Sequence, residues 1–144
     1  MELADALTFA RDRRQGVLAT IRKGGRPHLS NIMFVPQDAD TLLISVTDDR
    51  AKTANLRRDP RASLYVVGDS FYQYVVIEAR AELSAVATDP HDATVDQLVE
   101  YYRASAGEHE DWEDYRAAMV TDRRIALTLH PERAYGMGVS GPAA

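Results

Sequence analysis

The chain is built mainly from short runs of aliphatic and β-branched residues separated by turn sequences, and this pattern restricts its fold more than any other feature. Turn pairs such as Gly24-Gly25 favour tight hairpins. Because regular strand–helix–strand alternation is missing, we expect a small antiparallel barrel with short helices rather than a doubly wound parallel sheet. The roughly six or seven predicted strands occupy residues 17–21, 26–35, 41–47, 62–67, 72–83, 125–129 and 135–139.

Four further stretches have the spacing of short helices. They occupy residues 3–10, 50–58, 94–105 and 111–120. The second of them ends at Asp59-Pro60, because the residue before a proline avoids the helical region. A chain of 144 residues has the length of one domain, which we expect to span residues 1–144 and to fray over residues 140–144.

The composition excludes several classes of protein. Cysteine is absent, which excludes disulfide frameworks, thiolate nucleophiles and cysteine-ligated zinc and predicts a reducing, cytoplasmic location. No apolar run approaches the roughly 20 residues of a membrane helix, and the charged first segment is unlike a secretory signal. The formal net charge of −5 disfavours a general nucleic-acid-binding module.

A basic cluster at residues 50–61 stands out against this acidic composition. It contains five arginines and lysines and one carboxylate, Asp59. Arg50 and Lys52 lie where a predicted helix begins after a strand that ends in Ser45-Val46-Thr47, and free amides at a helix start favour anions. The cluster therefore suggests a phosphate site. On charge alone, a solvated basic helix face is the alternative.

Other motifs carry less weight. Residues 136–141 match G-x-G-x-x-G, but no helix can follow so close to the end of this sequence, so we regard the match as accidental. The four histidines lack metal-ligand spacing, and no Ser-His-Asp combination lies in a hydrolase context. We expect a solvated acidic patch, and no metal site, at His109, Glu110, Asp111, Glu113 and Asp114.

Two tyrosines have the spacing of a stacking platform. Tyr72 and Tyr74 lie two apart on one predicted strand, so their rings are expected on the same side, where they could stack on a planar ring. Two ordinary barrel aromatics explain the spacing equally well.

Taken together, these segments resemble the flavin and deazaflavin oxidoreductases of the pyridoxamine 5'-phosphate oxidase-like superfamily. The resemblance covers nearly the whole chain, and the full set of segments is most similar to the mycobacterial subgroup that binds coenzyme F420, an 8-hydroxy-5-deazaflavin. The resemblance implies a mainly β fold with short helices, a six-stranded antiparallel split β-barrel of the FMN-binding type. The segments that carry it are residues 16–21, 25–27, 29–31, 50–53, 55–63, 106–109 and 118–124.

The resemblance also implies a homodimer with two equivalent cofactor sites at the subunit interface. Arg50 and Lys52 match the positions that hold the cofactor phosphate, and Arg57 and Arg58 match positions near its acidic tail. Ser45, Val46 and Thr47, on the strand before the helix, would lie beneath the phosphate. Asn31, Ile32 and Met33, on the second strand, would line the ring. The other subunit would contribute Tyr72 and Tyr74.

The activity implied is hydride transfer from reduced coenzyme F420 to an unsaturated small-molecule acceptor. The cofactor performs the difficult step in such reactions, so no obligatory catalytic side chain is assigned. A proton could come from water, Tyr72, Tyr74 or His28. Two alternatives stay open at this stage: an FMN-dependent enzyme of the same fold, and a non-catalytic flavin or F420 carrier.

Overall fold

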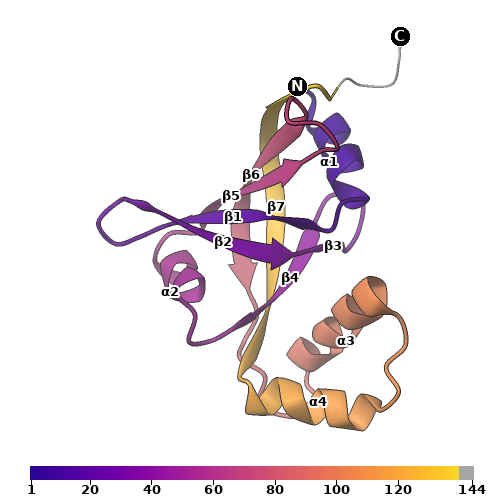
Figure 1. The fold of residues 1–144 in the computed structure, drawn as a ribbon. Coiled ribbons are helices and arrows are strands. Elements are labelled where there is room, and N and C mark those ends of the chain that lie inside the picture. The colour runs from indigo at the N-terminus through magenta and orange to yellow at the C-terminus, as the bar shows by residue number, and fades with distance from the viewer. Residues whose placement is uncertain (140–144) are drawn as a thin grey trace.

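A computed structural model describes residues 1–139 and contains one curled antiparallel sheet with four helices (Figure 1). The strand order is β2-β1-β5-β6-β7-β4-β3, with every neighbouring pair antiparallel. This confirms the predicted mainly β split-barrel class. The elements are α1 (Leu3–Arg11), β1 (Gln15–Ile21), β2 (Pro27–Met33), β3 (Val35–Pro36), β4 (Leu42–Thr47), α2 (Ala51–Arg58), β5 (Arg61–Val67), β6 (Tyr74–Leu83), α3 (Ala93–Ala106), α4 (Trp112–Thr121) and β7 (Arg124–Met137).

The sheet has seven strands, whereas the family resemblance implied six, and the predicted strand 26–35 is broken at Phe34 into β2 and β3. β2 and β3 lie at opposite ends of the strand order, although only this residue separates them in sequence. The sheet must therefore curl until its two edges meet. Phe34 is fully buried at this junction, and its backbone N–H donates to the carbonyl of Arg14 at 2.9 Å.

The predicted strands 125–129 and 135–139 are parts of one long strand, β7. The β6–β7 register shifts between Glu78 and Ala79, which pair with Arg133 and Pro131. Glu132 is therefore an extra residue on β7, as in a β-bulge. A bulge tolerates the missing N–H of Pro131, so the strand continues through a residue that normally ends one.

The core explains why β4 and β7 read as continuous apolar runs. Ile44 and Val46 of β4 and Leu127 of β7 lie in the barrel interior, whereas Leu43 and Ala126 face outward into a second apolar cluster beneath α3 and α4. Both faces of β4 and of residues 125–129 of β7 are consequently buried, so these sequences do not alternate.

Two helices, α1 and α2, pack against the barrel core, whereas α3 and α4 cover part of the outer surface. α1 packs against β6 and β7, α2 lies beside β1 and β2, and α3 and α4 cover β3, β4 and the start of β7 (Figure 1). The outer face of the remaining strands is exposed. We call it the exposed apolar face, and its large side chains include Leu29, Met33, Tyr65, Val67, Tyr135 and Met137.

No helix in residues 1–139 is long and apolar enough to cross a membrane. The predicted fraying of residues 140–144 lies outside the described residues, as do the last two residues of the G-x-G-x-x-G match. The described part of that match, residues 136–139, contains the end of β7.

Candidate functional site

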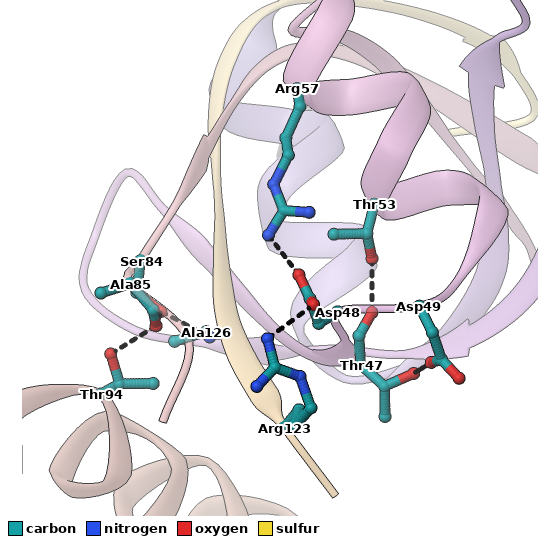
Figure 2. Close-up of polar contacts among 10 residues, drawn as sticks. All are labelled: Thr47, Asp48, Asp49, Thr53, Arg57, Ser84, Ala85, Thr94, Arg123 and Ala126. Carbon is teal, nitrogen blue, oxygen red and sulfur yellow. Dashed lines mark hydrogen bonds and ion pairs between the residues drawn. The ribbon is translucent and has the colours of Figure 1, made fainter. Parts of the chain in front are cut away.

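The turn between β4 and α2 is held by a polar network around Asp48 (Figure 2). Its carboxylate accepts hydrogen bonds from Arg57 at 2.6 Å and from Arg123 at 3.0 Å. These two hydrogen bonds, that from Arg57 foremost, lower the pKa of Asp48. Thr53 donates to the carbonyl of Thr47 at 2.7 Å and ties the first turn of α2 to the end of β4. The network fixes where α2 begins.

This network differs from what the sequence suggested for Arg57. The guanidinium of Arg57 is paired with Asp48 on the protein itself, so in this structure it does not project freely toward a ligand. The neighbouring Arg58 donates to the carbonyl of Ile21 and to the side chain of Asn55. Both arginines thus have structural partners.

Lys52 has a different environment from these paired arginines. It is half-buried in the first turn of α2 and forms no ion pair with any described residue. Burial lowers its pKa below the ordinary 10.5, and the positive charges of Arg50 and Arg124 lower it further. Three cations therefore lie close enough to repel one another, an arrangement that an anion would stabilise.

Arg50 lies at the N-cap of α2 and lines a groove of about 500 Å³ between the β4–α2 turn and the α4–β7 turn. The same groove contains the carboxylates of Asp49 and Asp122, so it is mixed in charge. Asp49 accepts a hydrogen bond from the hydroxyl of Thr47 at 2.7 Å, which lowers the pKa of its carboxyl.

Sequence analysis missed Arg124 as a candidate. It is the first residue of β7 and pairs with Thr47, so the sheet places it beside the residues predicted beneath the phosphate. Its Nη1 lies 3.5 Å from Oγ of Ser45. The run Asp122-Arg123-Arg124 offered no local signal, because only the pairing of β4 with β7 reveals the contact.

Strand alternation separates the residues predicted to contact the cofactor into those with outward-facing and those with inward-facing side chains. Asn31 and Met33 are exposed on the outer face of β2, whereas the side chain of Ile32 lies in the barrel core. Val46 of β4 is likewise a core residue. Ile32 and Val46 can therefore contact a bound ligand only through their backbone atoms.

Asn31 and Met33 border a shallow groove of about 440 Å³ on the exposed apolar face. Gly16, Val17 and Tyr65 form its other side. Because apolar groups dominate this groove and few polar atoms interrupt it, its chemistry suits one face of a flat, largely apolar ring system.

One contact links the groove to the cations. Tyr101 of α3 donates its hydroxyl hydrogen to the carbonyl of Met33 at 3.1 Å. Burial raises the pKa of Tyr101, and the nearby charge of Arg124 partly opposes that rise. Tyr101 thus contacts Met33 at the groove and is influenced by the charge of Arg124 in the cation cluster.

The prediction that Tyr72 and Tyr74 share a strand and a side is wrong. β6 begins at Tyr74, because residues 68–73 form the hairpin turn. Tyr72 is 69% exposed in that turn and packs edge-on against Phe71, which is 90% exposed. Tyr74 instead lies on the sheet, with its ring centroid 5.5 Å from that of Tyr65.

The predicted acidic patch has a structural role. Asp111 is the N-cap of α4 and accepts from the backbone N–H of Asp114 at 3.1 Å. The ring of His109 packs among aromatic side chains, and its Nδ1 accepts from the backbone N–H of Asp111 at 2.8 Å. The expectation that no metal binds here stays a prediction.

A comparison with protein-family models decides the family. The model for pyridoxamine 5'-phosphate oxidase matches residues 4–138. The chain belongs to this family. The match covers the whole sheet and all four helices, so the family's fold and the described fold are the same unit.

Solved structures with the same fold have varied descriptions. An F420 reductase is 22% identical over 90% of this chain and 94% of its own, with a TM-score of 0.64. A conserved hypothetical protein from Mycobacterium tuberculosis is 22% identical over 100% and 92%, with a TM-score of 0.72. The heme storage protein HutZ from Vibrio cholerae is 19% identical over 96% and 97%, with a TM-score of 0.68. At these identities the likeness establishes the fold alone.

Proposed function

We propose that this protein is a coenzyme F420-dependent oxidoreductase that passes a hydride to an unsaturated small molecule. The observation that carries the proposal is Lys52, a half-buried cation without a carboxylate partner in residues 1–139. Its position at the start of α2, together with the apolar groove bordered by Asn31 and Met33 elsewhere on the sheet, suits a ligand with a phosphate and a flat ring.

The residues present fit such a cofactor. Lys52 and Arg50 would hold the phosphate, with Ser45 and the backbone of residues 45–47 beneath it. Asn31 and Met33 would orient the ring, and the apolar groove would limit access of water to it. When bound, a reduced deazaflavin supplies the hydride, so binding and orientation are the tasks left to the protein.

The exposed apolar face supports a homodimer as part of this proposal. Monomers rarely expose several large apolar side chains together, and Val67 and Met137 lie on either side of Tyr74 through the pairing of β5, β6 and β7, with Tyr65 two residues from Val67 on β5. A second copy packed on this face would cover the groove and complete each site with residues such as Tyr72 and Tyr74 of the partner.

Two alternatives have support of their own. FMN also carries a phosphate and a flat ring, so an FMN-dependent enzyme, or a carrier without turnover, would use the same residues. The heme storage protein among the structural neighbours adds heme as a third ligand. Titration with coenzyme F420, FMN and hemin, followed by ring fluorescence or absorbance, identifies which of the three ligands the protein binds. Tightest binding of hemin or FMN would reject the F420 proposal.

We predict that K52A weakens cofactor binding about ten- to a hundredfold, because it removes a charge-assisted contact worth roughly 1.5–3 kcal/mol. The R50A/K52A double variant should lose most affinity. K23A is the matched control, because Lys23 is the other lysine and lies exposed at the β1–β2 turn.

The melting temperature of the apo protein should change little in these variants, because Lys52 forms no ion pair in the described part of the chain and two cations repel it. Isothermal titration and thermal melting measure the two quantities. Cofactor affinity of the double variant within twofold of wild type would place the site elsewhere.

A further inference from the structure

The start of β7 brings a cation to the site from a different part of the chain. Arg124 pairs with Thr47 across the β4–β7 ladder, and its Nη1 lies 3.5 Å from Oγ of Ser45. Arg50 and Lys52 come from the turn and helix that follow β4. The three cations therefore surround the end of β4 from two sides.

The guanidinium of Arg124 is incompletely paired. Its Nε is buried and has no hydrogen-bond partner among the described residues. The nearest carboxylate oxygen belongs to Asp122 and lies 3.9 Å from Nε, beyond hydrogen-bond distance. A buried N–H without an acceptor is unfavourable, and the side chain as a whole stays 32% exposed, so a guanidinium that turns toward a bound anion would relieve that cost.

The charges around Arg124 indicate the class of anion. Arg50 and Lys52 add two positive charges nearby, and the close carboxylates are those of Asp122 beside Arg124 and Asp49 beside Arg50. Three cations against two carboxylates leave a positive excess, which suits an oxyanion. The fork of a guanidinium matches phosphate oxygens, which a lysine ammonium contacts only as a point charge.

We propose that Arg124 is a phosphate-binding residue, the third cation of the site, which it reaches from β7 beside Ser45. The identity of the full ligand in this inference rests on the proposed function, whereas the binding of an anion by Arg124 does not. Tyr101, which donates to the Met33 carbonyl and is influenced by the charge of Arg124, then connects the phosphate end of the site to its ring end.

The test compares R124Q, R124K and R133Q. Arg133 is the matched control, because it is an exposed arginine on the same strand, paired with Glu78 at 3.0 Å. Binding of inorganic phosphate is measured by calorimetry and by its effect on the melting temperature, and binding of coenzyme F420 and FMN by ring fluorescence. Each variant's apo melting temperature reports whether it folds.

We expect R124Q to weaken phosphate and cofactor binding at least tenfold, R124K to weaken both less, and R133Q to stay within twofold of wild type. If R124Q does not fold, R124K decides, since it keeps the charge and removes the fork. Wild-type affinity for phosphate in a folded R124Q or R124K protein overturns the inference. Arg124-dependent phosphate binding in a protein that binds neither F420 nor FMN keeps this inference and rejects the proposed function.

Discussion

Lys52 is the residue whose ionisation most directly reports on the proposed site. Burial, followed by the charges of Arg50 and Arg124, lowers its pKa from 10.5 in the free protein, and a bound anion would raise that pKa again. Between the pKa of Lys52 in the free protein and its higher pKa in the complex, binding therefore takes up a proton. Phosphate affinity should fall as the pH rises through the pKa of Lys52 in the free protein.

Calorimetric titration with inorganic phosphate from about pH 8, where phosphate is largely a dianion, to 10.5 measures this dependence. K52R is the control, because arginine stays charged throughout. An equal decline in wild type and K52R would remove Lys52 from the binding step.

Asp59 is the opposite case to Lys52, because the folded protein favours the charged form of Asp59 and disfavours the charged form of Lys52. Hydrogen bonds from the side chain and then the backbone of Arg61 lower the pKa of Asp59 to about 2, from 3.8. A lowered folded-state pKa stabilises the fold above pH 3.8, and that contribution disappears as the pH falls toward 2. We predict that R61Q returns the pKa of Asp59 toward 3.8, measured by carboxyl NMR titration. A pKa near 2 in R61Q would mean that the backbone N–H alone suffices.

At the scale of elements, β1 depends on a close approach to β5. A Cβ on Gly16 would lie 2.7 Å from the carbonyl oxygen of Tyr65 and 3.0 Å from Cδ1 of Leu64. We predict that G16A destabilises the protein by about 1–3 kcal/mol, because the two strands must separate to admit the methyl group. Chemical denaturation measures the change.

Gly24 provides the control for this prediction, because nothing lies within 4 Å of a Cβ added there. G24A should therefore change the free energy of unfolding by less than about 0.5 kcal/mol. Equal stability of the two variants would show that β1 can shift away from β5 without cost. Because Gly16 also borders the apolar groove, G16A should narrow the groove as well.

At the scale of the whole molecule, the exposed apolar face predicts self-association. We expect a dimer at micromolar concentration in analytical ultracentrifugation, and V67E should shift it toward monomer, because a charge at Val67 would be buried between the copies. A117E is the control, since Ala117 is exposed on α4, away from this face. A wild-type monomer would defeat the shared-site proposal.

Much of the local structure followed from the sequence alone. The predicted helices 94–105 and 111–120 correspond to α3 and α4 within one residue at each end, because periodicity and capping residues are local signals. The position of Arg50 and Lys52 at the start of α2 was predictable for the same reason. Strand alternation could also have shown that Ile32 and Asn31 face opposite sides.

The tertiary structure decided everything that depends on which strands meet. Phe34 splits a predicted strand because closing the sheet sends β2 and β3 to opposite edges. Pro131 stays inside β7 because a bulge accommodates it. Arg57 forms an ion pair with Asp48, and Arg124 lies near Lys52, only because the β4–α2 turn lies against the start of β7. These contacts join residues far apart in sequence, and spacing along the chain carries no information about them.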